Sequence, residues 1–204
     1  MLARVVFITF EGVDGSGKTT QVELLKRALE AEGREVVATR EPGGTELGEH
    51  VREVVLHRHE QIVPWAEAAL FAAARAQLVE RVIAPALARG ATVLCDRYID
   101  SSLAYQGIAR GLGVEPVLEL NLQATHGLLP DRTVLLLVDP AKSRQRYSEH
   151  PDRIEREDDE FVAKVDRAYR ELAELFPSRI LAVDGTQEPE ELARTIYGQL
   201  RDLS

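Results

Sequence analysis

The segment GVDGSGKT, Gly12 to Thr19, constrains the fold more than any other part of the chain. It follows the apolar run Val5 to Phe10, which is rich in β-branched and aromatic residues, and it precedes the amphipathic stretch Gln21 to Ala31. Glycines between a strand and a helix let successive backbone N–H groups converge on an anion at the helix N-terminus. The sequence therefore predicts a strand, an anion-binding turn and a helix in direct succession.

Four further apolar runs have the same strand-like character, and each is followed by a turn signal. They are Glu35 to Thr39, Thr92 to Cys95, Thr133 to Val138 and Ile180 to Val183. Because these runs are apolar almost throughout, they are typical of parallel strands buried on both faces. Amphipathic stretches such as Ala66 to Ala88 and Phe161 to Leu175 lie between them. This alternation predicts an α/β fold, a doubly wound five-stranded parallel sheet flanked by helices.

Length and composition predict one globular domain over residues 1–204. The 204 residues are 45% hydrophobic and 29% charged, which suits a chain with an ordinary buried core. A formal net charge of -9 argues against nucleic-acid and anionic-membrane partners, because those need a basic surface. No apolar run approaches the roughly 20 residues of a membrane span, and the only cysteine, Cys95, can form no disulfide within the chain. We therefore expect a soluble, cytoplasmic protein.

The segment GVDGSGKT also matches the phosphate-binding pattern G-x-x-x-x-G-K-[ST] in the context that this pattern requires. In such a loop Lys18 reaches the outer phosphates of a nucleoside triphosphate, and the hydroxyl of Thr19 can hold Mg2+. A glycine turn that served structure alone would explain neither residue. We predict the P-loop NTPase fold, with ATP and Mg2+ bound at this turn. The predicted ATP-binding residues are Gly12, Val13, Asp14, Gly15, Ser16, Gly17, Lys18, Thr19 and Thr20.

The segment ATVLCDRYIDSSLAYQG indicates what the triphosphate is used for. Its strand ends at Asp96, where a carboxylate can approach the metal, so Thr19 and Asp96 are the predicted metal-side residues. The next residue is Arg97, and a cation there is better suited to an anionic acceptor than to activating water. This favours a kinase over an ATPase. A GTP-binding switch is disfavoured because the only asparagine, Asn121, is not followed by lysine.

Three segments, FEGVDGSGKTTQ, TREPGGTELG and CDRYIDSSLAYQG, occur in this order, and with them the chain resembles the thymidylate kinase family nearly end to end. The resemblance implies transfer of the γ-phosphoryl of ATP to dTMP, which gives dTDP and ADP for dTTP biosynthesis. It also implies a homodimer. The apolar helical runs Leu70 to Val82 and Leu118 to Leu122 can supply an interface, but core packing explains them too.

The resemblance implies a base-binding helix within LFAAARAQL, where Phe71 stacks on thymine and Arg75 donates to a base carbonyl. Ser102 and Gln106 are expected near the base edge. Each residue has a structural alternative, since Phe71 can pack in the core and Ser102 can cap a helix. Arg75 shares a helical face with Phe71 and would be an unusual choice for a core position.

The sugar and phosphate of dTMP are assigned by the same resemblance. Asp14 is expected to face the 3'-hydroxyl, and Tyr105 to crowd the 2' position and select deoxyribose, unless Tyr105 is simply a partly buried aromatic. Arg97 is expected to bind the monophosphate. Arg40 and Glu41, in TREPGGT, are expected beside the transferred group or its metal.

The segment KSRQRYSEHPDRIERED, residues 142–158, is dense in charges and is interrupted by Pro151. We interpret it as a short lid over the bound phosphates, with a solvated helix pair and loop as the alternative. In the family, the cation that meets the transferring phosphoryl comes from the P-loop or from the lid, and this P-loop has no arginine. The predicted catalytic residues are Lys18, Arg97 and a lid arginine, with Arg153 first and Arg144 and Arg146 as alternatives; Arg156 is a further candidate.

Two rival functions remain open from the sequence. Another nucleoside monophosphate kinase or a deoxynucleoside kinase has the same scaffold, and the latter would need a general base such as Glu41. A nucleotide-dependent switch would bind ATP or GTP without acceptor-dependent turnover.

Overall fold

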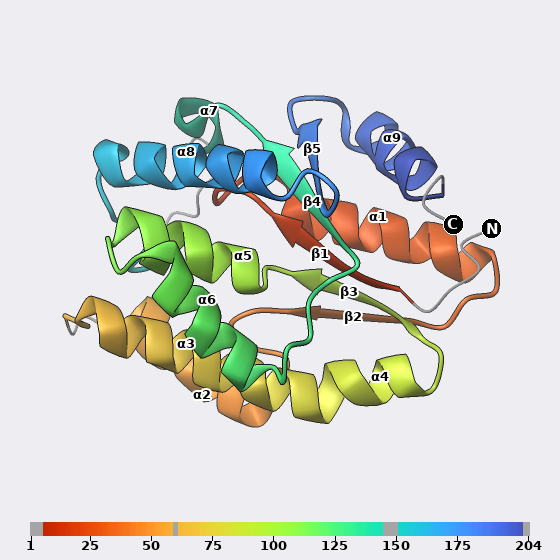
Figure 1. Ribbon diagram of the computed structural model, residues 1–204. Helices are drawn as coiled ribbons and strands as arrows, with labels where there is room; N and C mark the ends of the chain where they lie inside the picture. The colour runs from red at the N-terminus through yellow and green to blue at the C-terminus, as the bar shows by residue number, and fades with distance from the viewer. Residues whose placement is uncertain (1–5, 59–60, 145–150, 202–204) are drawn as a thin grey trace.

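A five-stranded sheet forms the centre of the computed structural model, which describes residues 6–58, 61–144 and 151–201 (Figure 1). The strands are β1 (Phe7–Glu11), β2 (Val36–Arg40), β3 (Thr92–Asp96), β4 (Arg132–Leu137) and β5 (Ile180–Asp184). Their order is β2-β3-β1-β4-β5, and every pairing is parallel. The predicted sheet is confirmed, and each predicted run differs from its strand by only one or two residues at either end.

Helices fill the connections between the strands. They are α1 (Lys18–Ala31), α2 (Glu46–Arg52), α3 (Pro64–Leu78), α4 (Ala84–Ala88), α5 (Ile99–Ser102), α6 (Val114–Ala124), α7 (Pro140–Arg144), α8 (Asp159–Leu175) and α9 (Pro189–Arg201), with π-helical segments η1 (Glu53–His57), η2 (Val79–Ile83) and η3 (Leu103–Ala109). The predicted stretch 66–88 is confirmed as the succession α3, η2 and α4. Helix α1 begins three residues before the predicted Gln21, because the end of the glycine turn forms its first turn.

The two faces of the sheet are covered by different helices. Side chains of Ile8, Phe10 and Leu94 pack against α1 and α9 on one face. Phe7 and Val93 point to the other face, where α3, α6 and α8 form the larger layer (Figure 1). Since successive residues of a strand alternate between faces, Glu11 at the end of β1 points into this larger layer, like Phe7.

The carboxyl ends of the strands meet at one edge of the sheet. Phe10 and Arg40 both lie beside Asp96 in the registers of β1, β2 and β3. The turn after β1 approaches the sheet closely, because a Cβ on Gly12 would lie 2.6 Å from the carbonyl oxygen of Leu136 in β4. Only glycine fits there, and its φ of 137° is also unfavourable for other residues. In open parallel sheets, ligands bind at this edge.

The core packing between β3 and α1 gives a stability prediction. Leu94 is 0% exposed, so Leu94→Ala should lower the free energy of unfolding by about 2–5 kcal/mol, through lost burial and a residual cavity. The matched control is Leu175→Ala in α8, where the side chain is 64% exposed and a change within about 0.5 kcal/mol is expected. Urea unfolding of both variants measures the difference, and equal losses would contradict this packing.

Candidate active site

The turn after β1 forms a cradle of backbone around a cavity. Gly12, Gly15 and Gly17 all have positive φ, at 137°, 73° and 95°, which turns the chain sharply between β1 and α1. Residues 14–21 line this cavity. The buried hydroxyl of Ser16 has no hydrogen-bond partner among the described residues. A buried polar atom of this kind beside a glycine-rich helix N-terminus suits a bound anion such as phosphate.

Lys18 lies at the base of the cradle, with 7% of its surface exposed. Its Nζ donates to the carbonyl oxygens of Gly12 and Val13, at 3.1 Å and 2.9 Å. Burial, together with the charge of Arg97, lowers the pKa of Lys18 to about 8. The residue lines the cradle cavity as predicted, whereas Gly12 and Val13 contribute carbonyl groups to Lys18. A bound polyphosphate would favour the charged form of Lys18.

Thr19 and Asp96 come together at the same cavity. The hydroxyl of Thr19 donates to Asp96 Oδ2 at 2.6 Å, and both residues line the cavity with the predicted Thr20. The described residues contain no group of three His, Cys, Asp or Glu side chains that could hold a metal ion. Mg2+ at triphosphate sites takes only one or two protein ligands beside phosphates and water. The hard oxygen donors of Thr19 and Asp96 therefore fit that ion.

Arg97 follows Asp96 directly and extends towards the other side of the cradle. Its Nη2 donates to Asp14 Oδ1 at 2.6 Å, and its guanidinium lies 5.4 Å from the ring centre of Tyr105. Burial favours a neutral Asp14, but the charges of Arg97 and Lys18 outweigh burial and lower the pKa of Asp14. The backbone of Arg97 has a φ of 70°, which is uncommon outside glycine.

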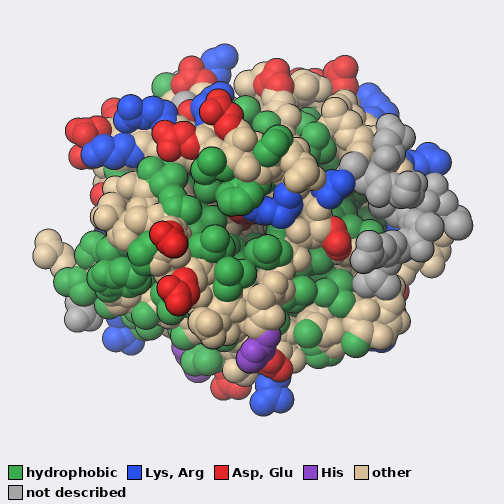
Figure 2. Space-filling view, viewed as in Figure 1, with side chains coloured by type: hydrophobic (Ala, Val, Ile, Leu, Met, Phe, Trp, Pro, Cys, Tyr) green, Lys and Arg blue, Asp and Glu red, His purple; other side chains and the backbone are tan. Residues whose placement is uncertain are grey.

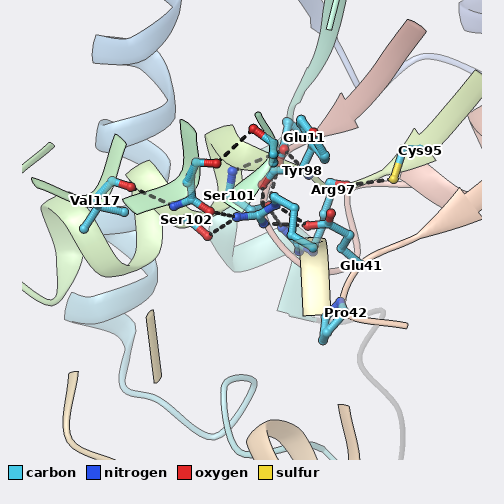
Figure 3. A network of polar contacts seen from close by, with 12 residues as sticks. Glu11, Glu41, Pro42, Cys95, Arg97, Tyr98, Ser101, Ser102 and Val117 are labelled. Atoms are coloured by element: carbon cyan, nitrogen blue, oxygen red, sulfur yellow. Dashed lines mark hydrogen bonds and ion pairs between the residues drawn. The ribbon is translucent and has the colours of Figure 1, made fainter. Parts of the chain in front are cut away.

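Glu11 holds the segment after Arg97 in place from inside the protein (Figure 3). Its carboxylate accepts hydrogen bonds from the backbone N–H groups of Tyr98 and Ser101 and from the hydroxyls of Ser101 and Tyr169. Both hydroxyls in turn contact Arg97 Nη1, at 3.0 Å and 3.1 Å. Burial and the nearby carboxylate of Asp100 raise the pKa of Glu11. This network fixes the position of the Arg97 guanidinium.

A second cavity adjoins the cradle on the side of α3 and η3. It is lined by Asp14, Glu41, Pro42, Arg52, Leu56, Phe71, Arg75, Arg97, Ser101, Ser102, Tyr105, Gln106, Asp152 and Ile154. Eight of the nine residues predicted to bind dTMP are among them; Arg40 is the exception. The wall thus combines two aromatic rings, several hydrogen-bonding groups and three arginines, which suits a small polar ligand with a flat ring.

Arg75 is buried at the base of the second cavity, with 1% of its side chain exposed. It donates to Ser102 Oγ and to the backbone carbonyl of Tyr98, and it also contacts Asn121 Oδ1. Its Nε and Nη2 both contact Glu41 Oε2, at 2.7 Å and 2.5 Å. These contacts hold its guanidinium rigidly in the cavity wall.

Glu41 is buried between the two cavities. Burial raises the pKa of Glu41 to about 7, although the charge of Arg75 favours the carboxylate. Its Oε1 has no hydrogen-bond partner among the described residues. Four residues, Asp14, Glu41, Arg52 and Arg97, line both cavities and so form the wall that the two share. Two of these four carry a positive charge.

The remaining predicted residues lie farther from this shared wall. Arg40 lines the cradle cavity with its side chain 57% exposed and pairs with Glu49. Arg153 donates to Glu67 and to the carbonyl of Val55. Arg144 pairs with Asp159. In the described part of the lid, neither Arg144 nor Arg153 borders the two cavities; Arg146 lies outside the described residues.

Three residues of this region were given no role from the sequence: Glu11 lies within FEGVDGSGKTTQ, whereas Arg52 and Glu67 lie outside the quoted segments. A carboxylate directly after the apolar run of β1 was the available signal for Glu11, because a charge rarely follows a buried strand without a partner. Arg52, at the end of α2, has ordinary helix neighbours, and its Nη1 donates to the carbonyl oxygen of Pro42. Glu67 lies in the first turn of α3, where an acidic residue also suits the helix dipole.

Comparison with known proteins relates this site to a family. The sequence model described as thymidylate kinase matches residues 10–196. Thymidylate kinases of Clavibacter michiganensis and Bifidobacterium longum are 54% and 48% identical, over 97% and 98% of this chain and 95% and 98% of their own. The crystal structure of thymidylate kinase from Ehrlichia chaffeensis superposes with a TM-score of 0.80 at 32% identity, covering 97% of this chain and 99% of that one. The chain belongs to the thymidylate kinase family.

Proposed function

We propose that the cradle holds ATP, that the second cavity holds dTMP, and that the γ-phosphoryl passes between them across the shared wall. The observation that carries this proposal is the wall itself, formed by Asp14, Glu41, Arg52 and Arg97. A reactant in each cavity would present its phosphate to the other over this wall. Holding two reactants in line in this way supplies much of the rate of such transfers.

Charge neutralisation is the main task of these residues. The acceptor is a phosphate oxygen that is largely ionised at neutral pH, since its second pKa is about 6, and it needs no general base. Lys18, Arg40, Arg52 and Arg97 are the cations that line the cradle cavity, and Arg52 and Arg97 also line the second cavity. A deoxynucleoside kinase would require a general base; in the candidate, Glu41, Arg75 holds Oε2 while Oε1 has no partner among the described residues. The two arginines of the shared wall, Arg52 and Arg97, are the observation that favours a phosphate acceptor.

We propose Thr19 and Asp96 as the residues that hold Mg2+. When bound beside the phosphates, this ion neutralises charge on the transferring group. The hydroxyl and carboxylate oxygens, 2.6 Å apart, support the assignment. Asp96 is also fixed by its backbone, because its carbonyl oxygen accepts from Glu41 N at 2.9 Å.

The base and sugar of dTMP are proposed to lie against η3 and α3. Phe71 offers a ring for stacking, while Arg75, Ser102 and Gln106 offer polar groups to the base edge. The hydroxyl of Tyr105 is 3.4 Å from Asp14 Oδ2. That contact supports a common position for both residues beside the sugar, where we propose that Tyr105 crowds a 2'-hydroxyl.

Residues 142–158 are proposed to act as the lid of a single domain. Asp152 and Ile154 line the dTMP cavity, which supports this role. Arg144, Arg146 and Arg153 stay our candidates for an additional phosphoryl cation. In the described arrangement Arg144 and Arg153 bind carboxylates, so either would contact phosphate only after the lid rearranged.

A homodimer is proposed from exposed apolar side chains on one side of the molecule. Hydrophobic side chains gather over α5 and α6 in Figure 2. Val63, just before α3, and Trp65, in its first turn, are 66% and 50% exposed. Leu70, Val82 and Leu118, in the predicted interface runs, are only partly buried against the core. Apolar patches of this kind suit contact with a second copy.

The cytoplasm is the proposed location, and small molecules are the proposed partners. No helix among the described residues has the length and apolar character to cross a membrane. Cys95 is a buried free thiol, as expected in a reducing compartment. The net charge of -9 supports the expectation that nucleic acid is not a partner.

Lys18→Ala should lower dTMP-dependent ADP release by on the order of a thousandfold, because it removes a fixed charge at the transferring phosphoryl. The thermal unfolding midpoint should remain close to that of the unaltered chain. Lys26→Ala, farther along α1, is the control and should retain full activity. A coupled assay for ADP with and without dTMP measures both, and near-normal turnover of Lys18→Ala would refute the site.

Removal of Mg2+ with EDTA should abolish transfer, and Thr19→Val should raise the Mg2+ concentration for half-maximal rate on the order of tenfold. The reason is the loss of one of two proposed oxygen donors. Thr195→Val is the matched control, because the hydroxyl of Thr195 bonds to Glu191 O within α9 and does not line the cavity. The reaction rate of each variant is measured at increasing Mg2+ concentration. If both variants need the same Mg2+ concentration for half-maximal rate, Thr19 is not a metal ligand.

The unaltered chain should phosphorylate dUMP at least about tenfold better than UMP, as kcat/KM, because the proposed role of Tyr105 is to crowd the 2'-hydroxyl. Tyr105→Leu should narrow that difference, whereas Tyr197→Leu in α9 should not. Initial rates with both nucleotides give the ratio. Equal values for dUMP and UMP in the unaltered chain would count against the sugar assignment.

A further inference from the structure

The carboxylate of Glu67 is the centre of a buried group of hydrogen bonds beside the proposed dTMP cavity. Its side chain is 1% exposed, at the point where α3 meets η3 and the lid. Gln106 Nε2 donates to Glu67 Oε1 at 2.8 Å, and Arg153 Nη2 donates to Oε2 at 2.5 Å. Arg110 contacts both oxygens, at 3.4 Å and 3.5 Å. One side chain thus joins a residue of the cavity wall to two cations.

These contacts determine which end of the Gln106 amide faces Glu67. A carboxylate oxygen that receives a hydrogen bond from a guanidinium is an acceptor, and Glu67 accepts from Arg153 and lies against Arg110. The amide nitrogen of Gln106 therefore faces Glu67. Because Gln106 lines the cavity, its amide oxygen is the group left for a ligand.

We propose that Glu67 is a positioning residue that sets base selection by presenting Gln106 Oε1 to the cavity as a hydrogen-bond acceptor. Thymine and uracil carry an N–H at N3 and match this acceptor. Cytosine carries a lone pair at N3 and cannot donate to Gln106 Oε1, so that buried oxygen is left without a hydrogen-bond partner. The inference rests on the proposed function, since it concerns the base of the nucleotide in this cavity.

Arg153 and Arg110, which do not line the cavity, hold the Glu67 carboxylate in place because each is itself fixed by other contacts. Arg153 also donates through its backbone N to Leu56 O and through Nε to Val55 O, at 2.8 Å and 2.7 Å. Arg110 donates to Glu157 at 2.5 Å and lies over the ring of Phe161. Glu67 has little freedom to release Gln106 while these contacts hold.

Glu67→Gln tests the proposal, because a neutral amide at position 67 can donate or accept and so permits either orientation of Gln106. We expect the ratio of kcat/KM for dTMP to that for dCMP to fall at least about tenfold. The ratio for dTMP to dUMP should stay unchanged, since both bases have N3–H. Glu119→Gln, on the exposed face of α6, is the matched control. Parallel loss for dTMP and dCMP, with a constant ratio, would overturn the proposal.

A double-mutant cycle separates positioning from a general structural effect. In a Gln106→Leu background, Glu67→Gln should change the dTMP to dCMP ratio no further, because the amide it orients is gone. Additive changes would overturn the proposal. If Glu67→Gln does not fold, the test is a crystal structure of the unaltered chain with dTMP. Gln106 Oε1 within hydrogen-bonding distance of N3 supports the proposal, and Nε2 at that position contradicts it.

These results can be told apart from a failure of the proposed function. If the unaltered chain releases no ADP in response to dTMP, the proposed function fails. If it does, and the ratio in Glu67→Gln equals that of the unaltered chain, only the role of Glu67 fails.

Discussion

The acceptance of four hydrogen bonds by Glu11 is the interaction on which the site depends. These bonds fix the chain from Tyr98 to Ser101 and leave Arg97 in a left-handed conformation that costs about 1–3 kcal/mol. The cost is tolerated because the surrounding contacts leave the backbone no alternative. Arg97, the proposed phosphate-binding cation, follows β3 and is held by Glu11 at the end of the central strand β1, so its position is set by the sheet.

The fold was predictable from sequence because its signals are local. Each buried strand is a short apolar run, and the turn at Gly12 to Thr19 has a residue pattern that few other structures require. The start of α1 was placed too late, since the first turn of that helix belongs to the glycine-rich loop as well. The residues of this first turn belong to both the loop and the helix, but their sequence shows only the pattern of the loop.

The site was predictable where its residues sit in motifs, and less so where contacts join distant segments. Arg75 was expected to be an unusual choice for a core position, yet it is buried because Glu41, Ser102 and Asn121 satisfy its donors. Those partners come from three separate parts of the chain. The pairing of Arg153 with Glu67 has a similar origin, with 86 residues between the partners. No spacing rule along a sequence encodes such a contact.

The close approach of Gly12 to Leu136 has a consequence for how the molecule adjusts to its ligands. With 2.6 Å to the nearest carbonyl oxygen, even a methyl group would separate the loop from β4. The loop is therefore packed directly on the backbone of the sheet, so this side of the cradle cavity has little freedom to change shape. The second cavity differs, because side chains of α3 and η3, among them Phe71 and Tyr105, form much of its wall. Adjustment to the proposed ligands is then expected from the side of the second cavity.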